Sequence, residues 1–159
     1  MSEHSPARAA GTPDAAPGLL AQLDSPDPDV RARAATALHR AGHPRALEAC
    51  LRTLDDAPDP LHADHTPSVQ CLIESGARAL PPLLELLDSE RADTRMHAER
   101  AVMGITRRLA GFDGRAWPEG AMERWMAWWS GIGYDSDAGP AARAGAIDRL
   151  REALPDLAA

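Results

Sequence analysis

A short hydrophobic pattern occurs three times in the first ninety residues, and each copy ends in aspartate. The copies occupy residues 19–24 (LLAQLD), 50–55 (CLRTLD) and 83–88 (LLELLD). Successive copies begin 31 and 33 residues apart, a period that is typical of two-helix solenoid units. Within each copy the apolar residues fall at positions i, i+1 and i+4, which places them on one face of a helix. The pattern therefore predicts a repeat protein, with the first helix of each unit at these positions.

A second helix is expected after each copy. In the first unit it follows a short turn at residues 26–28 (PDP), carries Val30, Ala34, Ala37 and Leu38 on one face, and ends at Gly42. The same template fits the third unit 64 residues later. Because alanine lets two helices approach closely, the pattern predicts antiparallel helix pairs stacked on one another.

The second unit departs from this template. Residues 57–66 (APDPLHADHT) carry prolines and polar residues where the template needs a helix. Thr66 is a good N-cap with Pro67 in the first turn, so a helix is expected only from there onward. Insertions in solenoid units tend to form loops on the binding face, which makes residues 57–66 a candidate binding site.

All aromatic residues lie in one segment near the C-terminus: Phe112, Trp117, Trp125, Trp128, Trp129 and Tyr134. Trp125, Trp128 and Trp129 are spaced i, i+3 and i+4 on a helix expected from Trp117 to about Ser130. A final helix is expected from Pro140. The tryptophan face has two interpretations, a cap that closes the last repeat or an exposed surface that binds a partner.

The repeat units resemble a known family. The segment Asp27-Pro28-Asp29-Val30-Arg31, with the alanines and Gly42 that follow, resembles the bacterial HEAT repeat, especially its bilin-lyase-like subclass. Residues 76–87 look like the first helix of such a repeat, and the resemblance spans about residues 17–109. It implies that Arg31 and Arg95 contact the aspartates of the preceding turn.

Repeat and resemblance together predict an all-α fold, a short right-handed α–α solenoid of HEAT-like helix pairs with a C-terminal capping helical segment. We expect a disordered segment at residues 1–16, three repeats at 17–111 and an aromatic-rich helical cap at 112–159.

Composition removes several classes of function. The formal net charge of -7 argues against a nucleic-acid partner or an anionic membrane surface. All 17 basic residues are arginine, so Schiff-base chemistry and the phosphate-binding lysine of a P-loop are excluded. The N-terminus lacks an apolar signal region and no apolar run reaches spanning length, so a cytoplasmic monomer is expected.

Candidate chemistry is sparse. Cys50 and Cys71 form no CxxC pair, which argues against a zinc knuckle or disulfide framework, and Cys50 is expected to be a small buried hydrophobe. His62, Asp64 and His65 could supply ligands to zinc or iron. No second histidine cluster supports them, so we predict a solvated turn and no metal, cofactor or catalytic residue.

The leading hypothesis is a non-catalytic protein–protein interaction or scaffold module that uses the second-helix face and the irregular 57–66 loop. Its partner is a protein or peptide of unknown identity. The alternative, implied by the resemblance, is a bilin-lyase-like chaperone or lyase that handles a tetrapyrrole. The candidate partner-binding residues are His62, Asp64, His65, Arg33, Arg40, Arg100, Trp125, Trp128 and Trp129.

Overall fold

The computed structural model of the protein describes residues 16–59, 61 and 65–157, and these ranges contain helices and turns without a β-strand. The elements are α1 (Ala16–Gln22), α2 (Pro28–Arg40), α3 (Ala46–Arg52), α4 (Pro67–Ser75), the 3₁₀ turn η2 (Gly76–Ala79), α5 (Leu80–Leu86), α6 (Ala92–Leu109), α7 (Ala121–Ile132) and α8 (Pro140–Leu157).

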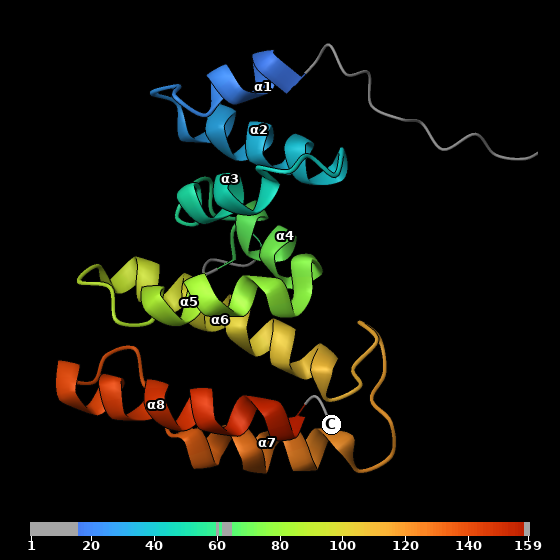
Figure 1. Cartoon of the computed structure of the whole chain (residues 1–159), viewed down its shortest axis with the longest axis vertical. Coiled ribbons are helices and arrows are strands. Elements are labelled where there is room, and N and C mark those ends of the chain that lie inside the picture. Colours follow the sequence, from blue (N-terminus) through green and yellow to red (C-terminus); the bar gives the residue numbers. More distant parts are fainter. Residues whose placement is uncertain (1–15, 60, 62–64, 158–159) are drawn as a thin grey trace, which may run out of the picture.

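The helices stack as pairs along the long axis of the molecule, with α1 at one end and the α7–α8 pair at the other (Figure 1). Helix α1 packs on α2, α3 on α4, α5 on α6 and α7 on α8. The second helices of successive repeats also touch, since α2 contacts α4 and α4 contacts α6. The predicted short all-helical solenoid is confirmed.

Local sequence explains where the second helices begin. The carboxylate of Asp27 accepts a hydrogen bond from the amide of Asp29 at 2.9 Å, and Pro28 occupies the first turn of α2. Thr66 caps α4 in the same way, because its Oγ1 accepts from the amide of Val69 at 3.2 Å. The prediction that a helix starts only after Thr66 is confirmed.

Helix α7 starts later than its sequence suggests. It begins at Ala121 rather than near Trp117, because Gly120 precedes it in the left-handed conformation with φ of 66°. Residues from Trp117 to Gly120 therefore form a bend that leads into α7. The final helix begins at Pro140, as predicted.

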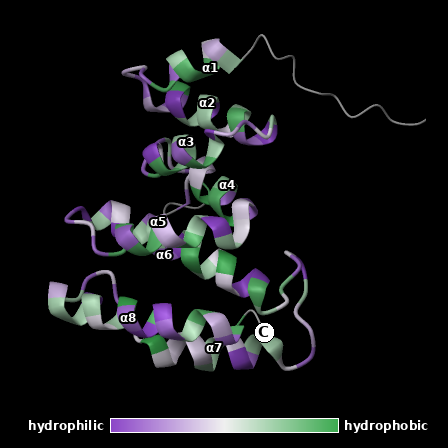
Figure 2. Ribbon diagram, in the orientation of Figure 1, coloured by the Kyte–Doolittle hydropathy of each residue, from purple (hydrophilic) through white to green (hydrophobic). Residues whose placement is uncertain are grey.

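The core of the repeats is aliphatic, and hydrophobic and hydrophilic positions alternate along the helices (Figure 2). Close approach of α4 and α6 depends on Gly104, where an added Cβ would lie 2.4 Å from Cδ1 of Ile73. The largest fully buried apolar side chains are Leu38, Leu72, Leu83, Leu87, Ile105, Leu150, Val69 and Val102.

Arg31 joins the first repeat to the second. Its Nη1 donates to the carbonyl oxygens of Ser25 at 2.8 Å and Pro26 at 3.1 Å. Its Nε and Nη2 donate to the two carboxylate oxygens of Asp56 at 2.8 and 2.7 Å. Asp56 belongs to the next turn, so the expectation of contacts to the preceding turn's aspartates is wrong: carbonyl groups are the acceptors there.

Arg95 plays the same part in the third repeat. Its Nη1 donates to the carbonyl oxygens of Ser89 at 2.8 Å and Glu90 at 3.0 Å, and its Nε donates to the carbonyl of Ser136 at 2.7 Å. Both arginines therefore tie their own turn to the following unit by a fork of donors that lysine could not provide.

The aspartates that end the three hydrophobic copies also link neighbouring units. Asp24 accepts from Arg52 at 2.6 Å, and Asp55 accepts from Thr94 at 2.6 Å. Asp88 pairs with Arg143 of α8, whose Nη2 lies 3.1 Å from its carboxylate. Because the third link reaches into α8, the α7–α8 pair stacks on the last repeat in the manner of a fourth unit.

Candidate functional site

The second helices form one face of the molecule, and their C-terminal halves are adjacent. The Nε2 atom of His39 on α2 lies 3.0 Å from the Glu74 carboxylate on α4. Ile73, next to Glu74, packs against Gly104 of α6. Grooves occur at both ends of this second-helix face.

The first groove lies between α2 and α4 and is bordered by the irregular turn of the second repeat. It consists of two adjoining cavities of about 510 and 670 Å³, both lined by Asp29, Ala57 and Pro67. Two of the predicted partner-binding residues, Arg33 and Arg40, line the smaller cavity, and their role stays a prediction. The lining is mixed in charge, because arginines and aspartates occur together.

Of the three predicted binding residues in the irregular turn, the structure describes one. His65 lines the larger cavity with Pro58 and Asp59. His62 and Asp64 lie outside the described residues, so the prediction of a solvated turn without a metal stays a prediction.

The second groove lies between α6 and α7 and is mainly apolar. Its volume is about 520 Å³. It is lined by Met103, Arg107, Phe112, Trp117, Met122, Trp125, Met126, Trp129 and Ser130.

The tryptophans make one wall of this α6–α7 groove rigid. Trp125 is buried, and its Nε1 donates to Oγ1 of Thr106 at 3.2 Å. The rings of Trp117 and Trp129 both contact the Trp125 ring, with their centroids 5.9 and 6.2 Å from the Trp125 centroid. The guanidinium of Arg107 lies over the Trp125 ring at 4.7 Å, within cation–π range. Aromatic stacking and one hydrogen bond therefore hold the wall in place.

Methionines form the exposed part of the groove. The side chains of Met122 and Met126 are 42% and 55% exposed, although both are large and apolar. Trp128 faces elsewhere: it is half-buried against the core and does not line the groove. Helix α7 thus covers the end of the repeat core with one side and lines a groove with another.

The electrostatics of the α6–α7 groove favour an acidic ligand group. Burial, and then the nearby charge of Arg100, lower the pKa of Arg107. Within the described part of the chain no carboxylate forms an ion pair with Arg107, and no acidic residue lines the groove. Arg100 stands seven residues earlier on α6, two turns along the same helix stripe.

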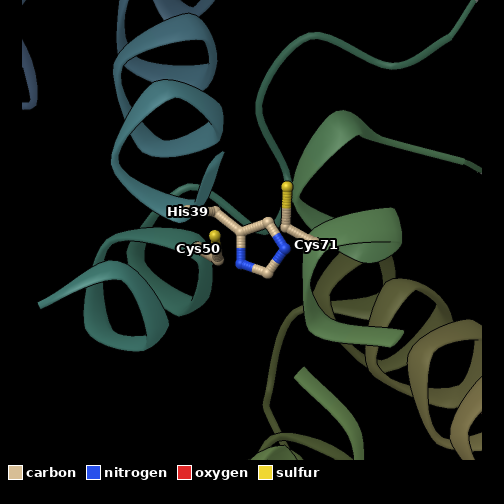
Figure 3. Close-up of side chains that lie close together, drawn as sticks. All are labelled: His39, Cys50 and Cys71. Atoms are coloured by element: carbon tan, nitrogen blue, oxygen red, sulfur yellow. The ribbon is translucent and has the colours of Figure 1, made fainter. Parts of the chain in front are cut away.

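A thiol–histidine cluster lies where the first and second repeats meet. His39, Cys50 and Cys71 come from α2, α3 and α4, and one ring nitrogen of His39 and the two cysteine sulfurs lie within 4.8 Å of one another. Figure 3 shows the imidazole ring placed between the two cysteine side chains. Both cysteines are buried free thiols, as was predicted for Cys50.

The two thiols have opposite acidities. The interaction between the two thiols lowers the pKa of Cys71 against the effect of its burial, and together with burial it raises the pKa of Cys50. Sequence reasoning missed this cluster because its members are far apart along the chain and match no ligand spacing. The one signal was the cysteine at position 50, where the other copies carry Leu19 and Leu83.

Comparisons with known proteins agree with this architecture. The family model described as HEAT repeats matches residues 16–103, which is more than half of the chain. No curated protein and no solved structure matches the chain. Among the helices that the structure describes, none combines the length and hydrophobicity needed to cross a membrane.

Proposed function

Since the chain belongs to the family of HEAT repeats, we propose that it is a non-catalytic interaction module that holds a segment of a protein partner on its second-helix face. HEAT repeats commonly mediate protein–protein interaction or scaffolding. The α6–α7 groove anchors the partner, and the α2–α4 groove, lined by Arg33, Arg40 and residues 57–59, 65 and 66 of the irregular turn, offers a second contact.

The observation that carries this proposal is the pair of exposed methionines beside a fixed tryptophan wall. Tryptophan is enriched at the energetic centres of interfaces, because it offers a large rigid contact area. Methionine adapts its shape to apolar side chains of different kinds. Met122 and Met126 leave apolar surface in water, while Trp125 and Trp129 behind them are already ordered. Binding would bury the methionine side chains, and the tryptophans would lose little conformational entropy because they are already ordered.

The charge of the groove specifies the partner's chemistry. We expect an amphipathic helix that places one or two large apolar side chains in the groove and a carboxylate beside Arg107. A groove of about 520 Å³ accommodates side chains of that number and size. A carboxylate would give the Arg107 guanidinium the charged partner that it lacks within the described residues.

The tetrapyrrole alternative uses the same surface. A bilin would need an apolar groove and a cation for its propionates, and Arg107 would have to be that cation. This alternative rests on the resemblance of the repeats, whereas the peptide proposal rests on the shape and charge of the groove.

The test is a selection of peptides from a random library on the full-length protein, followed by titration of a selected peptide. We expect enrichment of sequences in which large apolar residues are followed by aspartate or glutamate. Met126→Ser and Arg107→Ser should each weaken the titrated affinity by about tenfold. Met126 is exposed, so its replacement should leave the fold intact.

The matched control is Arg33→Ser with Arg40→Ser, which changes the α2–α4 groove alone. This control should keep the wild-type affinity for peptides anchored at α7. Peptides that lose affinity with the control but not with Met126→Ser would move the anchor to the α2–α4 groove. Tight binding of a free bilin, abolished by Arg107→Ser, without any enriched peptide would favour the tetrapyrrole alternative.

A further inference from the structure

We propose that His39, Cys50 and Cys71 form a zinc-binding site between the first and second repeats. The proposal is independent of the α6–α7 groove, because the cluster belongs to α2, α3 and α4. It concerns three side chains whose ligand atoms already lie within 4.8 Å of one another.

The donor set suits zinc. Thiolate sulfur and imidazole nitrogen are the ligands that zinc takes in tetrahedral sites, at about 2.3 and 2.0–2.1 Å. Those bond lengths place neighbouring ligand atoms about 3.5–3.8 Å apart. The present separations are at most 4.8 Å, so side-chain rotations that move the atoms by about 1 Å would close the site around an ion.

Glu74 supports the histidine. Its Oε2 lies 3.0 Å from Nε2 of His39, and its Oε1 accepts from the amide of Gln70 at 2.9 Å. With Nε2 bonded to a carboxylate, Nδ1 is the nitrogen left for an ion, which is the arrangement of carboxylate–histidine–zinc sites. Three protein ligands then leave one coordination position for water.

An ion can reach the site from one side. Cys50 is fully buried and Cys71 nearly so, but the side chains of His39 and Glu74 are 14% and 45% exposed. Thr36 lies 4.0 Å from the Cys71 sulfur and also lines the α2–α4 groove. The partly exposed side of His39 and Glu74 therefore offers an ion access to the cluster.

A bound ion would change how the repeats are joined. The three ligands stand on three helices, one from the first repeat and two from the second. Zinc would therefore cross-link the first repeat to the second. Because zinc binds the folded arrangement of ligands, its binding should raise the melting temperature.

The experiment uses the full-length protein, kept reduced with a phosphine and freed of metal by chelation, then titrated with Co²⁺ and afterwards with Zn²⁺. We expect one Co²⁺ per chain, with the visible bands of a tetrahedral ion and a thiolate charge-transfer band in the near ultraviolet. Zn²⁺ should displace Co²⁺ and raise Tm by several degrees.

Variants locate the site. Cys71→Ser should remove the charge-transfer band or halve it, and His39→Gln should weaken Co²⁺ binding at least about tenfold. His39 lies at the edge of the cluster, so His39→Gln remains informative if a cysteine variant fails to fold. The matched controls His43→Gln and His65→Gln replace histidines outside the cluster and should leave the titration unchanged.

Three results would overturn the proposal. The first is failure of the reduced protein to take up Co²⁺ or to gain Tm with Zn²⁺. The second is equal metal binding by wild type and His39→Gln, or its loss in His65→Gln, which would place the metal elsewhere. The third is a Cys50–Cys71 disulfide in air-oxidised protein combined with no metal binding when reduced, which would make the pair a redox couple instead.

Discussion

The first and third repeats turn between their helices in the same way, whereas the second repeat does not. Arg31 and Arg95 each stand four residues after the helix cap and donate to two carbonyls of their own turn and to the next unit. The second repeat has Gln70 at this place and a longer turn in front of Thr66. The second repeat therefore lacks the arginine at this place, and its longer turn borders a groove.

The same contrast applies to the hydrophobic copies. Position 83 carries leucine and position 50 carries cysteine, both fully buried. Leucine at this place contributes packing alone, but Cys50 also meets Cys71 and His39. The candidate metal site therefore lies where the second repeat departs from the other two. The candidate docking groove lies beside the aromatic residues that follow the last repeat.

The largest expected effect comes from comparing substitutions at the equivalent positions 83 and 50. Leu83→Ala should lower the free energy of unfolding by about 3 kcal/mol, because it leaves a cavity in a fully buried site. Cys50→Ala removes one sulfur atom and should cost about 1 kcal/mol in metal-free protein. Urea denaturation of both variants gives the comparison. Equal losses would mean that position 50 contributes to the core as a leucine does.

The next largest effect tests whether α7–α8 stacks as a fourth unit. Arg143 is buried and pairs with Asp88 of the third repeat. Arg143→Met should lower the free energy of unfolding by about 2 kcal/mol, because it removes a charge-assisted link and a bond to the Ala138 carbonyl. The control is Arg151→Met, whose ion pairs are exposed and whose loss should cost less than about 0.5 kcal/mol. Similar losses in the two variants would contradict the comparison with a repeat.

The periodic part of this fold could be predicted from the sequence, because helical period and cap residues are local signals. Thr66 with Pro67 gave the start of α4, and the position of Cys50 in the copy gave its burial. The start of α7 could not be foreseen, since it depends on the backbone conformation of Gly120. The His39–Cys50–Cys71 cluster and the link from Asp88 to Arg143 arise from stacking of units, which no local spacing reports.

A smaller effect concerns the link from Asp55, at the end of the second hydrophobic copy, to the third repeat. Burial raises the pKa of Asp55, but hydrogen bonds from His97 and Thr94 outweigh it, so the pKa is lowered overall. The unfolded chain then binds the proton more readily, so Asp55 stabilises the fold above its ordinary pKa, and this stability is lost as the pH falls through the folded-state pKa. Thr94→Val should lower the free energy of unfolding at pH 7 by about 1 kcal/mol. The free energy of unfolding should then differ less between pH 7 and pH 3 than it does in the wild type. Thermal melts across this range measure it, and an unchanged pH dependence would remove Thr94 from the explanation.

The smallest effect should be stabilising. Burial, aided by Asp135 and Asp137, raises the pKa of Glu99 despite Arg100 and Ser136, which act in the opposite direction. For a carboxyl group, a raised folded-state pKa favours the fold at low pH and weakens it as the pH rises past the unfolded value. Glu99→Gln should therefore raise Tm by a degree or two at pH 7 and by less at pH 4. A lower Tm at pH 7 would show that the Glu99 charge stabilises this end of the molecule.

The central claim is that the partner is anchored where the aromatics end the array, at the α6–α7 groove. Methyl NMR of protein labelled at methionine tests it most directly, because Met103, Met122 and Met126 line that groove and Met96 does not. Met96 lies two helical turns, about 10 Å, before Met103 on α6, so it serves as an internal control. A selected acidic amphipathic peptide should shift the methyl signals of Met122 and Met126 most, that of Met103 next and that of Met96 least. Saturable binding that leaves the Met122 and Met126 signals in place would contradict the account.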